Sequence, residues 1–204
     1  MDYGSQNGEN ISIFVRRVSR KENSKKSMPC LIFFQGGPGY ESPRPLSDSG
    51  WIKTASEVYD VILIDQRGTG LSSPISSESV LNMSDNDIAE YLTFFRADNI
   101  IKDAELFRKK LIGNKKWSVL GQSFGGFCAM TYLSFYPESL EKVFITGGIP
   151  PLKAHPDDIY RATYQRVLNK NKQFYKLFPN ARLNAIKIRD YLDKNNVHLP
   201  NGDL

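Results

Sequence analysis

The stretch W-S-V-L-G-Q-S-F-G-G at residues 117–126 runs from an apolar segment through G-x-S-x-G into sequence of helical character. This order predicts a strand, a sharp turn and a helix, with Ser123 on the turn. The turn would lift the Ser123 hydroxyl above the sheet edge, and Gly121 and Gly125 would leave room for neighbouring backbone. The amide end of the helix would favour negative charge there. The pattern predicts a nucleophilic serine, although G-x-S-x-G also occurs by chance in glycine-containing loops.

Further apolar runs of strand length lie on both sides of this stretch. They show little alternation of apolar and polar residues, which is typical of strands buried on both faces of a parallel sheet. Helical sequence separates them, so we expect an α/β fold with helices on both faces. The strands expected to be parallel neighbours end near Phe34, Ile64, Leu120 and Thr146. An alternating segment at residues 10–16 predicts an edge strand.

The remaining sequence predicts helices and one linker. A short helix is expected around residues 51–57, a polar linker at 76–87, and a helix from Ala97 to Gly113. From residue 150 onward no strand-like run reappears, and residues 160–176 and 184–194 have polar, helical character. We therefore predict two parts, the N-terminal part of an α/β core over 1–149 and the start of a truncated helical cap over 150–204.

Composition excludes several classes of protein. The 204 residues are 40% hydrophobic, enough for one substantial core. The net charge is +5, and its basic clusters at 16–26 and 170–176 lack the aromatic pattern of a nucleic-acid surface. No apolar run approaches the roughly 20 residues of a membrane span, and no secretory signal is visible. Cys30 and Cys128 make no disulfide framework, so a cytoplasmic protein is expected.

Three loops are expected to meet at the carboxyl edge of the sheet, at residues 35–39, 65–72 and 121–125. Ligands bind at this edge in open α/β sheets. Acyl transfer needs donors for an oxyanion as well as a nucleophile, and we expect them to be the backbone N–H groups of Phe124 and Gly37. For residues 35–39 the alternative is a simple Gly-Pro turn. A phosphate-binding loop fits poorly, because no Gly-Lys-Ser/Thr follows.

Together, Q-G-G-P-G at 35–39, D-Q-R-G-T-G-L-S at 65–72 and G-Q-S-F-G-G at 121–126 closely resemble the prolyl aminopeptidases, or proline iminopeptidases. These enzymes belong to the α/β-hydrolase superfamily. The stretch G-G-I-P-P-L at 147–152 and H-P-D-D at 155–158 resemble the larger, long-capped branch. The resemblance runs from about residue 11 to residue 204. One departure is Gln35, which stands where many members have histidine.

The resemblance implies a serine hydrolase that releases an N-terminal proline from a peptide, without metal or cofactor. Ser123 would be the nucleophile, with Gly37 and Phe124 as oxyanion donors. The partner is a peptide with a free N-terminal proline, and an oligomer is possible. Asp65 and Arg67 are expected to brace the loops and to pair with each other. The implied loop-support residues are Gly36, Pro38, Gly39, Asp65, Arg67, Gly121 and Gly125.

The triad acid and base are not found in this sequence. In the α/β-hydrolase fold they follow the serine in the order acid, then histidine. Only His155 and His198 are present, and neither follows the late apolar strands that present these groups. We expect both histidines to be structural or exposed, and the acid and base to lie beyond Leu204. Asp157 and Asp158 are expected to start a helix.

Two classes of function remain open for this chain. The first is the proline-releasing aminopeptidase, with little or no activity in the 204-residue chain alone. The second is a non-enzymatic relative, either a receptor-like protein or an inactive fragment that binds a partner. Within the hydrolases, an esterase or amidase is also possible, because specificity lies mainly in the cap. The intact Ser123 pattern favours the first class, and the missing acid and base favour the second for this polypeptide.

Overall fold

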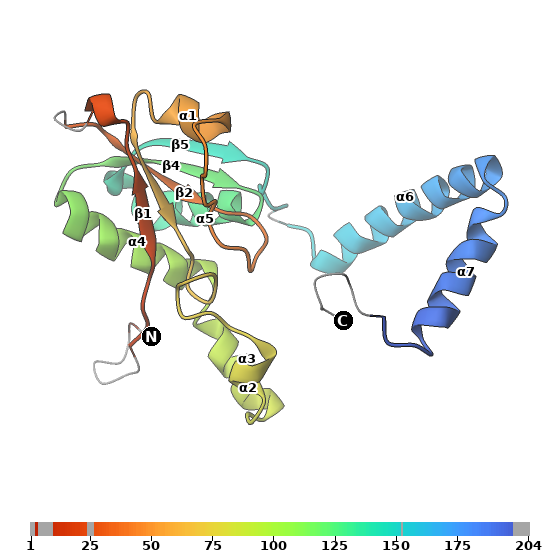
Figure 1. Ribbon diagram of the computed structural model, residues 1–204. Coiled ribbons are helices and arrows are strands. Elements are labelled where there is room, and N and C mark those ends of the chain that lie inside the picture. Colours follow the sequence, from red (N-terminus) through yellow and green to blue (C-terminus); the bar gives the residue numbers. More distant parts are fainter. Residues whose placement is uncertain (1–2, 4–9, 24–26, 152, 198–204) are drawn as a thin grey trace. The chain divides into compact units, whose positions relative to one another are not determined.

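The computed structural model describes residue 3 and residues 10–23, 27–151 and 153–197. The chain divides into two compact units, residues 1–150 and 151–204. This division falls one residue from the boundary expected from the sequence. The first unit contains every strand of the described residues, and the second contains two helices (Figure 1).

The first unit is built on one five-stranded sheet in the order β1-β3-β2-β4-β5 (Figure 1). The four strands predicted as parallel neighbours are parallel and adjacent, which confirms the expected sheet. Only β1 runs antiparallel, on the outer side of β3. The strands are β1 Val15–Val18, β2 Cys30–Phe34, β3 Asp60–Ile64, β4 Trp117–Gln122 and β5 Leu140–Thr146.

The edge strand was predicted at residues 10–16, and its ladder begins later, at Val15. Before it, two backbone N–H groups donate to serine side chains, and the Phe14 carbonyl accepts from the Asp65 N–H at 3.1 Å. The N–H of Phe14 donates to Ser72 Oγ at 2.8 Å, and the N–H of Ser12 donates to Ser73 Oγ at 3.1 Å. These bonds attach the chain to the loop that follows β3, so the alternating pattern marks an extended segment that is only partly strand.

Helices cover both faces of the sheet. The even-numbered side chains of β2 and β3, such as Ile32 and Ile62, pack with α4 and α5. The opposite face carries Phe33 and Leu63, which pack against Ile52 of α1. This arrangement confirms the predicted α/β architecture. The helices of this unit are α1 Gly50–Ala55, α2 Ser77–Val80, α3 Asp85–Thr93, α4 Ala97–Ile112 and α5 Phe124–Phe135.

The prediction of a polar linker at residues 76–87 is wrong in part, because α2 and the first residues of α3 lie there. Each helix begins with a capping box, in which a serine side chain and the side chain three residues later bond each other's backbone N–H. Ser76 and Ser79 form the first box, and Ser84 and Asp87 form the second. Neither helix buries a residue, and the polar residues that suggested a linker form the helix caps.

A buried polar network joins α4 to the helix that follows Ser123. The Glu105 carboxylate accepts hydrogen bonds from Arg108 at 2.8 and 2.9 Å and from the Tyr132 hydroxyl at 2.8 Å. The Trp117 indole donates to the Tyr132 hydroxyl at 3.1 Å. Burial raises the pKa of the Tyr132 hydroxyl, and the Glu105 carboxylate raises it further. Tyr132 therefore stays a donor, and the network fixes α5 against α4 and β4.

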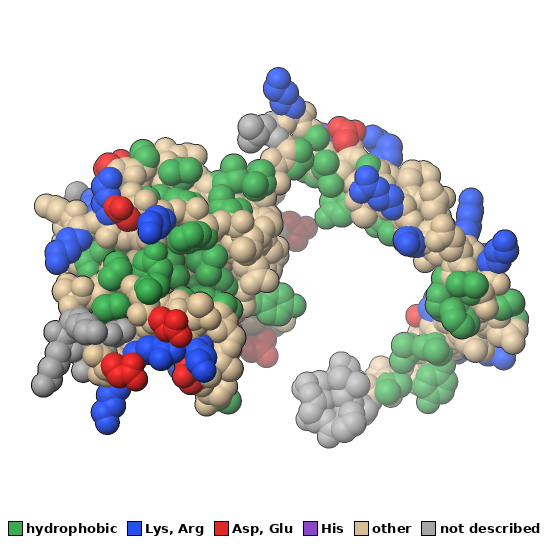
Figure 2. All heavy atoms as spheres, turned by 90° about the horizontal axis from the view of Figure 1, so that it is seen from above, with side chains coloured by type: hydrophobic (Ala, Val, Ile, Leu, Met, Phe, Trp, Pro, Cys, Tyr) green, Lys and Arg blue, Asp and Glu red, His purple; other side chains and the backbone are tan. Residues whose placement is uncertain are grey.

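The second unit contains α6 Pro156–Leu177 and α7 Ala181–Leu192. In its described part neither helix buries a residue, and apolar side chains such as Phe174, Leu177 and Ile188 are exposed. Figure 2 shows lysine and arginine side chains spread along these helices beside apolar ones. Helices with one apolar stripe normally bury it against a partner. The assignment of this unit as the start of a cap stays a prediction.

The two cysteines and the lengths of the helices bear on the expected surroundings of the protein. Cys30 and Cys128 are buried and form no disulfide. Burial raises the pKa of the Cys128 thiol to about 12, so this thiol stays protonated. Across the described residues, every helix is too short or too polar to cross a bilayer.

Candidate active site

Ser123 lies on the turn between β4 and α5, with φ 53° and ψ −119°. A non-glycine residue rarely adopts positive φ, and such strain persists only where surrounding structure holds it. Here the Ser123 N–H donates to the Thr146 carbonyl at 3.1 Å, and the Ser123 carbonyl accepts from the Gly126 N–H at 2.8 Å. The strained turn predicted from the sequence is present, and Ser123 is exposed on it.

Two glycines allow this turn to form. A Cβ atom on Gly121 would collide with the carbonyl of Gly125, and one on Gly125 would collide with the carbonyl of Phe34. The first turn of α5 therefore lies directly on the ends of β4 and β2. Close approach of backbone to backbone, rather than an unusual φ, requires glycine at these two positions.

The loop at residues 35–39 lies against Ser123. A Cβ atom on Gly36 would stand 3.0 Å from Ser123 Cβ and 3.0 Å from the Gln122 carbonyl oxygen. The loop is held from two sides, because the Gly36 N–H donates to Gln35 Oε1 at 2.9 Å and Gln66 Nε2 donates to the Gln35 carbonyl at 3.0 Å. The structure thus brings this loop and the serine together. Their separation is well below the limit of about 10 Å set for two segments that bind one oxyanion.

The two expected oxyanion donors lie on these adjoining segments. Phe124 is the first residue of α5, so its N–H belongs to the turn whose amides have no acceptor within the helix. Gly37 has φ +121°, a conformation that favours glycine. Pro38 and Gly39 follow in the same turn. The convergence of the Phe124 and Gly37 N–H groups on one point stays a prediction.

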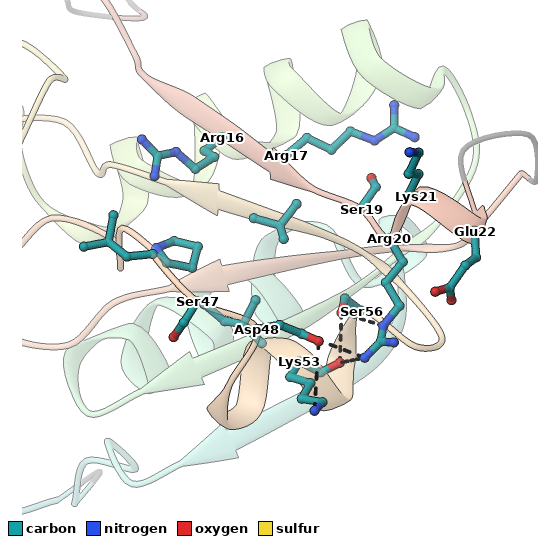
Figure 3. A pocket seen from close by; sticks show the side chains of 14 residues that line it. Arg16, Arg17, Ser19, Arg20, Lys21, Glu22, Ser47, Asp48, Lys53 and Ser56 are labelled. Atoms are coloured by element: carbon teal, nitrogen blue, oxygen red, sulfur yellow. Dashed lines mark hydrogen bonds and ion pairs between the residues drawn. The ribbon is translucent and has the colours of Figure 1, made fainter.

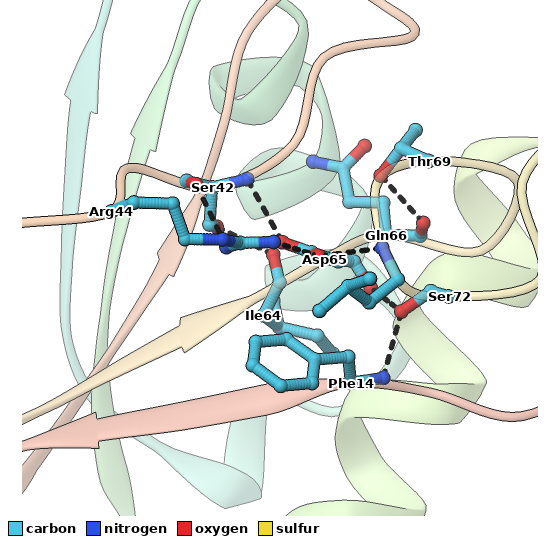
Figure 4. Close-up of polar contacts among 9 residues, drawn as sticks. Phe14, Ser42, Arg44, Ile64, Asp65, Gln66, Thr69 and Ser72 are labelled. Carbon is cyan, nitrogen blue, oxygen red and sulfur yellow. Dashed lines mark hydrogen bonds and ion pairs between the residues drawn. The ribbon is translucent and has the colours of Figure 1, made fainter.

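Asp65 is fully buried at the end of β3 and accepts a forked hydrogen bond from Arg44 (Figure 4). The N–H groups of Ser42 and Leu71 also donate to its carboxylate, at 3.1 and 3.0 Å. Burial alone would raise the pKa of this carboxyl. The hydrogen bonds from Arg44, Leu71 and Ser42 outweigh burial and hold the Asp65 pKa below its usual value.

The prediction that Asp65 and Arg67 form an ion pair with each other is wrong. Arg67 donates instead to Asp103 of α4, at 2.7 Å through Nε and 2.6 Å through one terminal nitrogen, and to the Phe94 carbonyl at 2.7 Å. Arg67 lies within a turn in which the Thr69 N–H donates to the Gln66 carbonyl at 3.0 Å. The Asp65 and Arg67 side chains are therefore directed to different segments, and each buried charge pairs with a residue distant in sequence.

We expect Asp65→Asn to lower the free energy of unfolding by about 3 kcal/mol at neutral pH, because it leaves the Arg44 charge without its buried partner. The folded-state pKa of Asp65 lies below the unfolded value of 3.8, so this stabilisation is fully present above that value. It is lost as the pH falls through the folded-state pKa. Urea unfolding of both proteins from neutral to acidic pH measures the difference, which should shrink in acid.

The control for this prediction is Asp48→Asn. The Asp48 side chain is 66% exposed and forms ion pairs at 3.9 Å, so its loss should change stability little at any pH. A difference between wild type and Asp65→Asn that widens in acid would contradict the prediction.

A cavity of about 610 Å³ lies away from Ser123, between β1 and α1 (Figure 3). Its lining is basic, and one of its cations, Arg20, already has partners. Arg20 donates to Ser56 Oγ, to the Lys53 carbonyl and to Glu57, each at 3.3 Å. The Arg20 guanidinium is therefore held by neighbouring groups of the protein.

Two other kinds of reactive group are metal-binding clusters and histidines. Within the part of the chain that the structure describes, no three His, Cys, Asp or Glu side chains lie close enough to hold a metal. His155 caps α6, because its Nδ1 accepts from the Asp157 N–H at 3.3 Å. The helix begins at Pro156 with Asp157 and Asp158 in its first turn, as expected for helix-starting carboxylates. His198 lies outside the described residues.

Four residues of this region were not assigned roles from the sequence. Gln66 lies in the motif at residues 65–72, but nothing in the sequence indicates that its side chain bonds the Gln35 carbonyl. The partners of the buried charges, Arg44 and Asp103, lie in a proline-rich loop and a helix that look ordinary in sequence. Ser42 donates to the Ile64 carbonyl at 2.6 Å and is likewise visible only in the fold.

Comparison with known proteins shows the fold family of this chain and proteins that it is similar to. Residues 29–188 match the model of the alpha/beta hydrolase fold family. The chain is 47% identical to the proline iminopeptidase of Aeromonas sobria over 95% of its own length and 46% of that protein. It is 38% identical to a proline iminopeptidase of Aspergillus aculeatus, over 87% of the chain and 41% of that protein. The chain thus spans about half the length of the curated relatives it matches.

A solved structure of a marine microorganism esterase aligns with 95% of this chain and 67% of its own, at 21% identity and a TM-score of 0.48. The family match covers most of the chain, and the described sheet has the parallel strands and covering helices that the match implies. The chain belongs to the alpha/beta hydrolase fold family.

Proposed function

We propose that Ser123 is the nucleophile of a peptidase that releases proline from the N-terminus of peptides. The observation that carries the proposal is the strained Ser123 turn with the glycine loop packed against it. The similarity to two proline iminopeptidases supports the choice of substrate. The geometry supports acyl transfer, and the relatives support the prolyl specificity.

In the proposed reaction the Ser123 hydroxyl attacks the carbonyl carbon of the N-terminal prolyl residue. The resulting oxyanion accepts hydrogen bonds from the Phe124 and Gly37 N–H groups. Collapse of the intermediate releases the remainder of the peptide as an amine and leaves a prolyl ester on Ser123. Water then hydrolyses this ester and regenerates the serine.

The reaction also needs a base to take the Ser123 proton, and an acid to orient that base. We propose that both come from outside the described residues, from the part of the longer relatives that this chain does not match. His155 is engaged in capping a helix. Asp65 and Arg67 brace the loops through Arg44 and Asp103 and take no part in the proton transfers.

The test uses an extended protein, in which this chain is continued by the second half found in proline iminopeptidases. We expect it to hydrolyse prolyl 4-nitroanilide at least about tenfold faster, in kcat/KM, than alanyl 4-nitroanilide. A difference of this size requires only about 1.4 kcal/mol of selective transition-state binding. Release of 4-nitroaniline is followed by absorbance.

The same protein is assayed with 4-nitrophenyl butyrate. Rapid ester hydrolysis without prolyl amide hydrolysis would contradict the proposal and favour an esterase of the same fold. Failure to turn over any of the three substrates would favour the receptor-like or inactive alternative.

A further inference from the structure

A cavity of about 770 Å³ lies within the first unit, at the beginnings of α4 and α5. It adjoins the candidate active site directly, because its lining includes Phe124, which follows Ser123 in the chain, and Pro38 of the glycine loop. Its volume falls in the range typical of small-molecule sites, about 300–1,000 Å³.

Aromatic rings form one wall of this cavity. Phe124 and Phe127 lie one helical turn apart on α5, with their rings stacked at a centroid distance of 6.2 Å. Phe94 and Phe95, which precede α4, also line the cavity. Such a wall suits an apolar or aromatic side chain.

Among the described residues, the cavity is lined by two cations, Lys102 and Arg96, which differ in their partners. Lys102 bonds Asn99 Oδ1 at 3.0 Å and pairs with Asp98 at 3.8 Å, so its charge is already compensated. Arg96 also lines the cavity and is exposed. Among the residues that the structure describes, no carboxylate lies within ion-pair distance of its guanidinium. The cavity therefore combines an aromatic wall with an uncompensated positive charge.

We propose that this cavity binds the leaving part of a short peptide, with Phe124 and Phe127 contacting its apolar side chain and Arg96 contacting its terminal carboxylate. This assignment rests on the proposed function. The two ends of a peptide substrate carry opposite charges. The N-terminal ammonium group is repelled by Arg96, whereas the C-terminal carboxylate matches the forked donors of a guanidinium. The preferred substrates are thus short peptides with an apolar last residue and a free carboxylate.

The test measures binding, so that it does not depend on turnover. N-acetylphenylalanine and its amide differ in charge only at the group that would contact Arg96. Each is titrated into the 204-residue chain and the extended protein, and the dissociation constant is taken from NMR chemical-shift changes. We expect the carboxylate to bind about two- to fivefold more tightly than the amide, the range for an ion pair open to water.

Four variants define the result. Arg96→Gln should remove the preference for the carboxylate, and Arg96→Lys should retain part of it. Arg16→Gln, which removes a cation lining the other cavity, should leave the preference unchanged. Thr131→Trp, which fills the cavity from α5, should weaken binding of both probes. Circular dichroism checks that each variant is folded.

The outcomes separate this proposal from the proposed function. Equal binding of the two probes, or a preference that survives Arg96→Gln, overturns the assignment of the cavity even if proline is released. A preference that depends on Arg96, in an extended protein that releases no proline, supports the cavity as a carboxylate site and overturns the proposed activity alone.

Discussion

Replacing Ser123 with alanine in the extended protein is expected to reduce the turnover of a prolyl amide by about 10⁴–10⁶-fold. The variant keeps the oxyanion donors and the substrate contacts but cannot form the acyl-enzyme. Loss of the nucleophile in a serine protease of another fold costs about 10⁶-fold in kcat. The residual rate comes from binding and the oxyanion hole. The measurement is release of 4-nitroaniline from prolyl 4-nitroanilide at saturating substrate.

Ser134→Ala is the matched control. Ser134 lies on the same helix, is exposed, and donates to the Met130 carbonyl at 2.9 Å, so its removal should leave turnover unchanged. A fluorophosphonate probe should label the extended wild-type protein and not Ser123→Ala. If Ser123→Ala retained near-normal turnover, Ser123 would not be the nucleophile and the proposed mechanism would fail.

The 204-residue chain by itself is expected to hydrolyse the same prolyl amide at least about 10²–10⁴-fold more slowly than the extended protein. The physical reason is that the proposed mechanism takes its base from outside the described residues, and an unassisted serine hydroxyl is a weak nucleophile at neutral pH. The two proteins are compared at equal concentration in the same assay. Circular dichroism of the shorter chain checks that it contains the expected helices and strands.

The histidines supply the control for this comparison. His155→Ala and His198→Ala should leave the rate of the extended protein unchanged within about twofold. His155 caps α6 through its Nδ1, and loss of a helix cap usually costs about 1 kcal/mol of stability, not activity. A fully active 204-residue chain that one of these substitutions inactivates would identify that histidine as the base and would refute our account.

The sequence predicted those elements whose signals are local. The unalternating apolar runs of β2 and β3 required burial on both faces, whichever helices covered them. The glycines around Ser123 marked a close approach of backbone, which the positions of Gly121 and Gly125 now explain. By contrast, α2 and the start of α3 were missed, because the serines and aspartates of their capping boxes are favoured in turns as well as at helix starts.

Pairing of buried charges could not be predicted in the same way. Asp65 and Arg67 lie two residues apart, and proximity in sequence suggested that they form a pair. Their partners are Arg44 and Asp103, which reach them from a loop and from α4. A buried charge requires an opposite charge, but which one it finds depends on the segments that packing brings alongside.

The sequence by itself determined the α/β class, the parallel strands and the exposed serine turn, because apolar runs and close-packed glycines act within a few residues. Only the tertiary structure decided the strand order β1-β3-β2-β4-β5, the contact of Gly36 with Ser123, and the cavity that joins Phe124 to Arg96. These features depend on contacts between distant segments, whose free energy is gained only when the whole sheet and its covering helices pack together.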